Sequence, residues 1–170
     1  KWKRVKTAVQ TLLAYLPEDA KYQVCLFNSS THLLYKSNRN IPWLDVSDPN
    51  ARANILTALN EFVPSDGANH ELAFLYADEL DADNVVLLTD GLPTLAYSMQ
   101  VGGAINEFQR INMMNAAMNV FPQNASINIL LFPMKGDPGA APYYWRFSYI
   151  QNGALITPSR NWPTVTTAKR

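Results

Sequence analysis

The chain has 170 residues, 48% of them hydrophobic and 11% aromatic, which is enough to fill the core of one domain. Lys and Arg together number 14, as do Asp and Glu, so the charge balance disfavours binding to nucleic acid or to an anionic membrane surface. The one cysteine, Cys25, leaves no internal disulfide, and its apolar surroundings predict a buried structural thiol. We expect a single domain over residues 1–170, without a membrane span.

The N-terminal part predicts a helix followed by a hairpin. Apolar residues recur at helical spacing from Trp2 to Leu16, with no N-cap and no strand before them. We therefore expect the domain to be incomplete at its N-terminus. Two short strands, Tyr22–Phe27 and His32–Tyr35, predict a hairpin that supplies the one antiparallel edge of the sheet.

Two further helices precede the next strand. Asp48 and Pro49 predict the start of the first helix, and the turn 65–69 predicts the start of the second. The residues expected to face the core are Ile55, Leu56, Leu59 and Phe62 in the first helix, and Leu72, Ala73 and Leu80 in the second.

The C-terminal half alternates strands and helices. The apolar runs Val85–Thr89 and Ile127–Phe132 predict buried strands, with Cys25, Val86, Leu87, Ile129 and Leu130 in the core. A helix is expected at about 107–121, with Phe108, Ile111, Met114, Met118 and Phe121 on one side. A short aromatic helix at 142–150, with Trp145 buried, and a last strand at 154–157 follow, and Trp162 is expected to fold back. This order predicts an α/β fold, a Rossmann-like doubly wound and mainly parallel sheet with helices on both faces.

The candidate site lies where the strand 85–89 ends. Asp90 and Gly91 follow that strand directly, and ligands bind outside the carboxyl ends of strands in open α/β sheets. The loop Asp66, Gly67, Ala68 and Asn69 precedes the helix that leads into the same strand, so both loops can lie along one edge. An Asx turn or a helix cap is the alternative role for Asp90.

Most catalytic motifs are absent from the sequence. There is no G-x-S-x-G motif, no Gly-rich phosphate loop and no Cys/His zinc spacing. The two histidines are His32, in the hairpin, and His70, in the first turn of a helix, and we expect surface or packing roles for both. The sequence therefore offers no strong candidate for a histidine general base.

Nearly the whole chain resembles the von Willebrand factor A domain family. The matching stretches, after the first helix, are "YQVCLFNSS", "EFVPSDGANHELAFLYADEL", "NVVLLTDGLPT", "INILLFPMKGDPGAAPYYWRF" and "NGALITPSRNWP". More narrowly, they look like a bacterial subgroup whose members are often tethered to the inner membrane, with the A domain outside the cytoplasm. The resemblance implies a periplasmic or extracytoplasmic, membrane-associated protein.

The family also implies a metal-ion-dependent adhesion site at the sheet edge. Its ligands are an Asp-x-Ser-x-Ser motif after the first strand, a Thr in the loop before the third helix, and an Asp that aligns with Asp90. Here the first motif is missing, and Ala68 stands where the Thr belongs, although Asp66 or Asn69 can offer an oxygen. We expect no tightly bound ion, and Mg²⁺ or Mn²⁺ only if missing N-terminal ligands are supplied.

The expected function is a non-catalytic module that binds a protein partner through loops at the carboxyl edge of the sheet. The binding-loop residues are Asp66, Gly67, Ala68, Asn69, Asp90 and Gly91, with Asp90 also the metal ligand if one is needed. One alternative is a structural assembly piece of a membrane-associated complex whose metal site has decayed. A less favoured alternative is a metal-dependent phosphohydrolase that uses Asp90.

Overall fold

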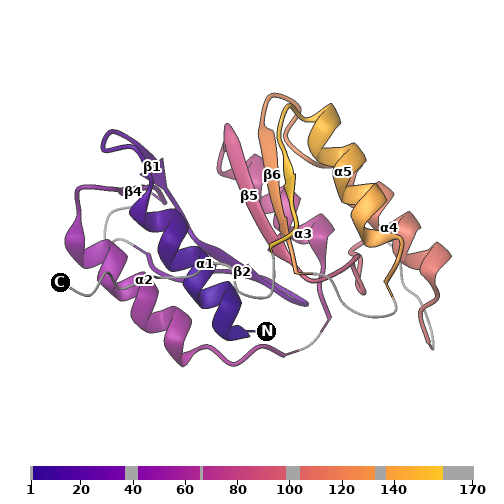
Figure 1. Ribbon diagram of the computed structural model, residues 1–170, viewed down its shortest axis with the longest axis horizontal. Helices are drawn as coiled ribbons and strands as arrows, with labels where there is room; N and C mark the ends of the chain where they lie inside the picture. The colour runs from indigo at the N-terminus through magenta and orange to yellow at the C-terminus, as the bar shows by residue number, and fades with distance from the viewer. Residues whose placement is uncertain (1, 37–41, 66, 99–103, 133–136, 159–170) are drawn as a thin grey trace. The chain divides into compact units, whose positions relative to one another are not determined.

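A computed structural model describes residues 2–36, 42–65, 67–98, 104–132 and 137–158 of the protein (Figure 1). By their contacts the residues form two compact units. The first unit comprises Lys1–Gln23, Tyr35–Val63 and Pro158–Arg170, and the second comprises Val24–Leu34 and Pro64–Thr157. That both belong to one domain stays a prediction.

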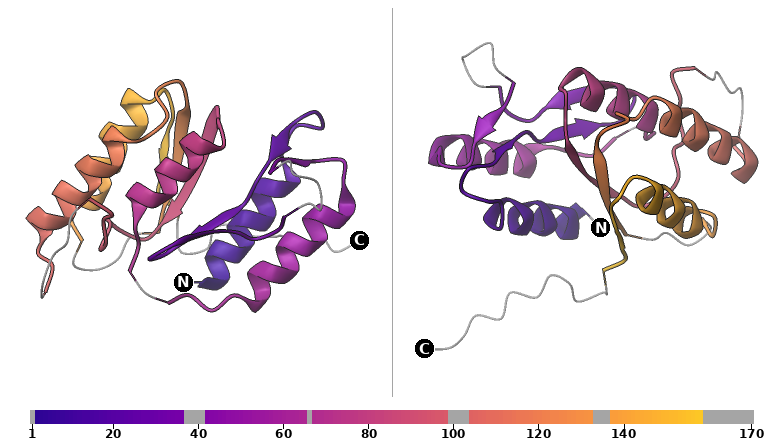
Figure 2. Two further views of the ribbon diagram at one scale, coloured as in Figure 1. Left: turned by 180° about the vertical axis from the view of Figure 1, so that it is seen from behind. Right: turned by 90° about the horizontal axis from the view of Figure 1, so that it is seen from above.

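The first unit is built on two helices that lie side by side (Figures 1 and 2). Its elements are α1 (Trp2–Ala14), α2 (Pro49–Glu61) and the antiparallel pair β1 (Lys21–Tyr22) and β4 (Leu44–Asp45). Asp48 caps α2 as predicted, because its carboxylate accepts from the Asn50 and Ala51 N–H groups at 2.9 and 3.3 Å. Ile55 and Leu59 of α2 are buried, as the spacing predicts.

The second unit begins with the hairpin of β2 (Cys25–Phe27) and β3 (Thr31–Leu33), which confirms the predicted antiparallel pair. Among the described residues these two strands form a sheet of their own and do not pair with the main sheet, so the prediction that they supply its one antiparallel edge is not borne out. Cys25 is half-buried rather than buried, because a two-stranded sheet covers little of its own surface. Burial still raises the pKa of the Cys25 thiol to about 11, so the group stays protonated at neutral pH.

The main sheet of the second unit is parallel and has the order β5-β6-β7. The strands are β5 (Asn84–Thr89), β6 (Ser126–Leu131) and β7 (Leu155–Ile156). Three helices alternate with them: α3 (His70–Glu79), α4 (Glu107–Asn119) and α5 (Ala140–Ile150). The predicted α/β class and its parallel sheet are therefore confirmed.

The core of the second unit lies on one face of this sheet. Leu87 of β5 is in register with Ile129 of β6, so the two side chains share a face. Against them pack Phe74 from α3 and Phe147 from α5, with Phe121 just after α4. The three phenylalanine rings contact one another, with centroids 5.1 to 5.6 Å apart. All three helices thus cover the same face, so the predicted helices on both faces are not found among the described residues of this unit.

Several burial predictions are wrong. Val86 is 42% exposed, because it points to the opposite face of β5, which lies at the edge of the described sheet rather than at its centre. Trp145 is 61% exposed, since α5 buries Tyr144 and Phe147 instead. Phe108 of α4 is exposed as well, because α4 buries Met113, Met114 and Ala117.

The predicted core side of α3 is also wrong. The buried residues of α3 are His70, Glu71 and Phe74, whereas the predicted Leu72, Ala73 and Leu80 are half-buried. The prediction for Trp162 lies outside the described residues.

Candidate functional site

Asp90 directly follows β5, at the edge of the sheet where β5 and β6 both have their carboxyl ends; we call this the carboxyl edge. The last residue of β5, Thr89, is buried, and its hydroxyl donates to the Gly91 carbonyl at 3.0 Å. This local hydrogen bond bends the chain immediately after the strand. The bend leaves Asp90 exposed, while Gly91 is buried.

The loop after Asp90 is anchored from beneath by a buried ion pair. The Asp137 carboxylate accepts from the Leu92 N–H at 2.8 Å and from the Arg110 guanidinium at 2.7 Å. Arg110 also donates to the Leu92 and Pro93 carbonyls. The ion pair is largely shielded from water and holds the loop through Oδ2 of Asp137, while Oδ1 of the same carboxylate is buried without a partner among the described residues.

Gly91 is required by this arrangement. A Cβ atom at position 91 would lie only 2.3 Å from Oδ2 of Asp137, the oxygen that binds both Leu92 and Arg110. Any larger residue would push the Asp137 carboxylate out of its place. The Gly in the strand-end motif therefore allows a second chain segment to approach closely.

The loop that contains Gly67, Ala68 and Asn69 is hydrogen-bonded to the loop after β5. The Ala68 N–H donates to the Thr94 hydroxyl at 2.9 Å, and the Ala68 carbonyl accepts from the Thr94 and Leu95 N–H groups at 3.0 and 3.2 Å. Asn69 and Leu95 also form an isolated parallel bridge. The structure thus brings together two of the sequence-predicted segments, although Asp66 lies outside the described residues.

Asn69 has a structural role within this loop. Its side-chain oxygen accepts from the Leu72 N–H at 3.1 Å, and this contact caps α3 as the sequence predicts. Its own N–H donates to the Asn28 carbonyl at 3.0 Å, which ties the hairpin turn to the start of α3. Asn69 is buried, so its amide is part of the loop framework.

Beneath both loops lies a fully buried histidine. His70 Nε2 is 2.9 Å from the Tyr144 hydroxyl, which donates to the Gly91 carbonyl at 2.7 Å. Because that hydroxyl has one hydrogen, the arrangement favours the His70 tautomer that carries its proton on Nε2. The rings of Phe27 and Phe74 close off the site, with centroids 5.1 and 6.2 Å from the imidazole.

His70 is held neutral by its surroundings. Burial lowers its pKa from 6.5 to about 3, the Ala68 backbone opposes this shift, and the Arg110 charge adds to it. Burial likewise raises the pKa of Tyr144 far above its usual range. Both groups are therefore uncharged at neutral pH and act as hydrogen-bonding supports of Gly91, in agreement with the packing role expected for His70.

The far end of the loop after β5 is fixed by a buried carboxylate. Glu71, in the first turn of α3, accepts from the N–H of Ser98 at 3.0 Å and from its hydroxyl at 2.9 Å. Nothing in the local sequence distinguishes Glu71 from a solvated helix residue, so its burial and its contact with Ser98 were not predicted. Together with Arg110 it fixes both ends of the loop 91–98.

Two aromatic side chains are exposed near the carboxyl edge. Tyr97, in the loop after β5, is 72% exposed, and Phe108, in the first turn of α4, is 70% exposed. The start of α4 lies at this edge, because α4 connects the carboxyl end of β5 to the start of the parallel strand β6. The edge therefore displays two large aromatic groups together with Asp90.

The residues described at this edge do not fit a divalent metal ion. Ala68 carries no ligand atom, and the Asn69 oxygen is occupied as a cap. Asp137 is paired with the Arg110 cation, which would repel a second cation. Within the described part of the chain, His, Cys, Asp and Glu side chains form no group of three or more that could hold a metal. We derive no chemistry through a metal.

The segments of the carboxyl edge can be found from the sequence, but the side chains that hold them in place cannot. Arg110, Asp137 and Tyr144 reach the loop from α4, from the turn before α5 and from α5 itself. The only signal in the sequence is the "GDPG" stretch, which predicts a turn but does not show that Asp137 contacts the loop after β5. Such long-range partners have no fixed spacing from Asp90.

Comparison with known proteins identifies the fold. A scan of protein-family models and a search of curated proteins find no match to the chain. Among solved structures it is similar to a von Willebrand factor type A protein from Catenulispora acidiphila, with a TM-score of 0.66 and 14% sequence identity. The similarity covers 93% of this chain and 34% of that one, so the chain spans about a third of that protein's length. At this identity the likeness shows the fold alone: the chain has the α/β fold of a von Willebrand factor type A protein.

Proposed function

We propose that this chain is a non-catalytic protein-binding module whose partner docks on the loops of the carboxyl edge. We call this surface the loop platform and define it as residues Gly67–Asn69 and Asp90–Ser98. The observation that carries the proposal is that the two loops are hydrogen-bonded to each other and anchored from below, while Asp90, Tyr97 and Ser98 are exposed. A loop that is already ordered loses little conformational entropy when a partner binds.

The exposed side chains on and beside the platform have the chemistry of interface anchors. Tyr97 and Phe108 are large aromatic groups that gain free energy when a partner covers them, and Tyr and Phe are enriched at protein interfaces. Asp90 adds an exposed carboxylate that can pair with a Lys or Arg of the partner. Binding through these groups needs no metal.

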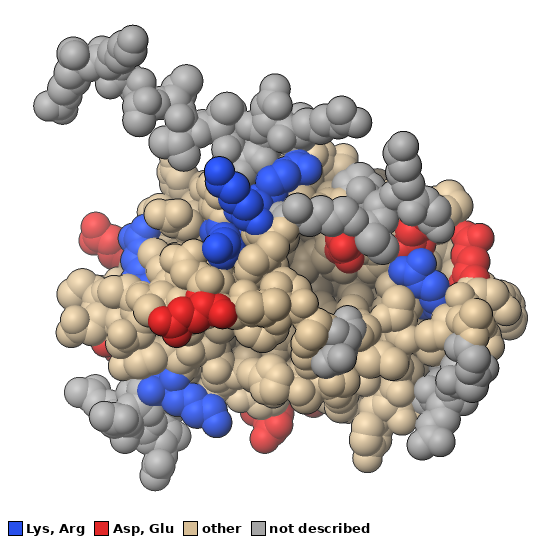
Figure 3. Space-filling view, turned by 90° about the horizontal axis from the view of Figure 1, so that it is seen from below, with Lys and Arg blue, Asp and Glu red and all other residues tan. Residues whose placement is uncertain are grey.

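Charge supports a protein partner rather than a polyanion. On the face drawn in Figure 3, Lys and Arg side chains and Asp and Glu side chains both occur among many uncharged residues, and a few Lys and Arg side chains lie together. This agrees with equal numbers of acidic and basic residues in the sequence. The described residues on this face form no broad basic surface of the kind that nucleic acid requires.

Catalysis has weaker support than binding. His70 is buried beneath the loops and hydrogen-bonded to Tyr144, so it has no access to a substrate. The structure does place a second carboxylate, Asp137, next to Gly91, which the phosphohydrolase alternative needs. That carboxylate is buried and paired with Arg110, so its negative charge is already neutralised by the guanidinium.

A second candidate is a structural assembly piece of a membrane-associated complex whose metal site has decayed. The position of Ala68 favours it, because Ala68 uses its backbone to join the two loops and has no side-chain oxygen. The described residues include no helix long and apolar enough to cross a bilayer. Membrane association and an extracytoplasmic location therefore rest on the family resemblance, and cell fractionation of the full-length protein tests them.

Site-specific photocrosslinking tests the proposal. A photoreactive phenylalanine analogue replaces Tyr97 or Phe108 in cells of the source organism, and Tyr15, which follows α1 and is 83% exposed, serves as the control position. We expect a discrete adduct of the same mass at positions 97 and 108, and none at position 15. The partner is then identified and its affinity measured with and without a chelator.

The outcomes separate the two candidates. Replacing Tyr97 and Phe108 by Ser should weaken binding of the identified partner at least about tenfold, since each anchor contributes on the order of 1–2 kcal/mol. An unchanged affinity in the double variant, with an unchanged melting temperature, contradicts the loop platform. Loss of binding on chelation contradicts a metal-independent interface. Adducts formed only with further copies of the chain favour the assembly role.

A further inference from the structure

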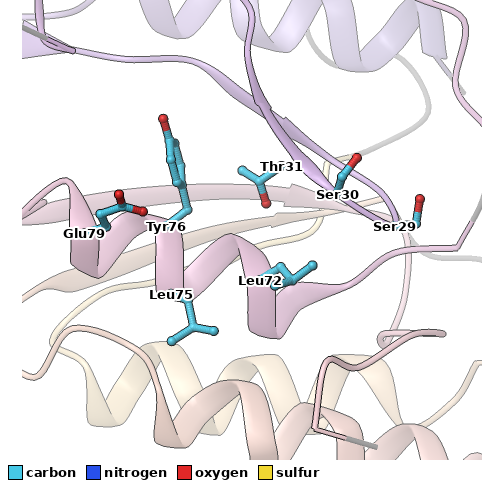
Figure 4. A pocket seen from close by; sticks show the side chains of 7 residues that line it. All are labelled: Ser29, Ser30, Thr31, Leu72, Leu75, Tyr76 and Glu79. Carbon is cyan, nitrogen blue, oxygen red and sulfur yellow. The ribbon is translucent and has the colours of Figure 1, made fainter. Parts of the chain in front are cut away.

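A groove on the second unit runs along the flank of α3. It has a volume of about 260 Å³ and lies between the β2–β3 hairpin and the helix (Figure 4). We call it the α3 groove. Its helix wall is formed by Leu72, Leu75, Tyr76 and Glu79, and its hairpin wall by Ser29, Ser30 and Thr31. The helix residues recur at intervals of three and four, so they form one stripe of α3.

Both walls of the α3 groove are held in place by hydrogen bonds. The Asn28 carbonyl accepts from the Asn69 N–H at the start of α3, which fixes the hairpin turn against the helix. The Asn28 side chain accepts from the N–H and hydroxyl of Ser30 at 3.0 and 3.2 Å, which orders the turn itself. The Ser30 hydroxyl also lies 2.9 Å from His32 Nε2. The groove is therefore preformed.

The groove wall includes an unsatisfied polar atom. The Thr31 hydroxyl oxygen is shielded from solvent and has no hydrogen-bond partner among the described residues. Figure 4 shows this hydroxyl on the side of the hairpin that faces α3. Because water cannot reach this oxygen, the hydroxyl is part of the groove wall, and we assign it no contact with an occupant.

One end of the groove is acidic. Glu79 lies there, in the last turn of α3, where the negative end of the helix dipole adds to its charge. Asp78, Asp81 and Asp83 are exposed nearby in the chain, and the sequence contains no Lys, Arg or His from Glu71 to Gln109. The other end, at Leu72 and Leu75, is apolar. An occupant should therefore be apolar at one end and cationic at the other.

We propose that the α3 groove binds an extended segment of a protein partner that carries an apolar side chain and, two residues away, a Lys or Arg. From midway between Leu72 and Leu75 to Glu79 is five to six helix residues, or about 8 Å. Two residue intervals of an extended peptide span about 7 Å, and the long side chain of Lys or Arg covers the remaining distance. The apolar side chain lies against Leu72 and Leu75, and the cation meets Glu79. This binding does not depend on the loop platform.

An NMR titration of the full chain with short peptides tests the groove. The probe is the capped peptide Arg-Ser-Leu-Ser-Arg, which presents the required pair in both chain directions, and the matched control is Glu-Ser-Leu-Ser-Glu. We expect the probe to shift the amide signals of residues 29–31 and 72–79, with a Kd on the order of 1 mM, as befits a single short contact. The acidic control should shift none of them.

Variants separate the charge from the shape of the groove. Glu79→Gln should weaken binding of the basic peptide about two- to fivefold, which is the effect of losing one exposed ion pair. Asp78→Asn, on the same helix but outside the groove, should leave the Kd unchanged. Thr31→Val replaces the shielded hydroxyl with a methyl group of similar size and should leave the Kd unchanged, because an occupant does not reach that oxygen.

Three results would overturn the proposal: no signal change with the basic peptide at about 5 mM, equal binding of the acidic control, or equal effects of the substitutions at positions 78 and 79. Signal changes confined to residues 90–98 would instead place peptide binding on the loop platform. That result would support the proposed function while contradicting the α3 groove.

Discussion

Acid should destabilise this protein through His70, which cannot take up a proton where it lies. In the unfolded chain the pKa of His70 has its ordinary value of 6.5, whereas in the folded protein burial lowers it to about 3. The neutral form is thus stabilised by folding. This stability is fully present above pH 6.5 and is lost as the pH falls toward 3, because only the unfolded chain binds the proton over that range.

The size of the effect follows from the pKa difference. Between pH 6 and pH 3.5 each pH unit should lower the free energy of unfolding by about 1.4 kcal/mol. From pH 7 to pH 4.5 the His70 contribution is therefore about 2.5 kcal/mol, which is a large part of the stability of a typical domain. Protonation would also repel Arg110 and disturb the hydrogen bond to Tyr144 that supports Gly91.

Urea unfolding at pH 7.0, 5.5 and 4.5, followed by circular dichroism, measures this dependence. Carboxylates also titrate in this range, so the test is the difference between the protein and His70→Gln, which keeps an amide donor for Tyr144 but does not titrate. We expect the stability loss between pH 7.0 and 4.5 to be smaller by about 2.5 kcal/mol in His70→Gln. His32→Gln, at an exposed position, should leave the loss unchanged. His70→Phe serves as a second variant should the Gln protein fail to fold.

An equal loss of stability with falling pH in the protein and in both position-70 variants would contradict a His70 that is held neutral by burial. The same conclusion would follow if His32→Gln abolished the pH dependence of stability, since the titrating group would then be the exposed histidine.

Three further predictions concern the core, the strand-end turn and the metal. Leu87→Ala removes a buried side chain that packs on the helices and should cost about 2–5 kcal/mol in urea unfolding, and a loss below about 0.5 kcal/mol would contradict its place in the core. Gly91→Ala should cost about 1–3 kcal/mol, because its Cβ displaces the Asp137 carboxylate, and Gly91→Ala in an Asp137→Ala background should cost less. Calorimetric titration with Mg²⁺ or Mn²⁺ should show no binding tighter than about 100 μM. Such binding, abolished by Asp90→Ala, would show that this edge does hold a metal.

The sequence alone determines the elements whose cause is local. The start of α2 follows from Asp48, whose side chain needs only the next two N–H groups to act as a cap. The same holds for Asn69 and α3. The parallel strands follow from uninterrupted apolar runs, and the position of Asp90 at a strand end follows from the residue order. These features depend on neighbours within a few residues, so the sequence contains the information directly.

The tertiary structure decides which of these residues are buried and what supports the site. Val86 and Trp145 have the hydrophobicity of core residues, yet their exposure depends on which face of a strand or helix meets a neighbour. The supports of the loop platform come from far along the chain: the Tyr144 hydroxyl meets a histidine 74 residues away, and Asp137 meets the Leu92 N–H 45 residues away. Such pairs exist only because the sheet and three helices place distant segments at one edge. No local pattern encodes that distance, so the sequence predicts the segments of the carboxyl edge but not the distant side chains that support them.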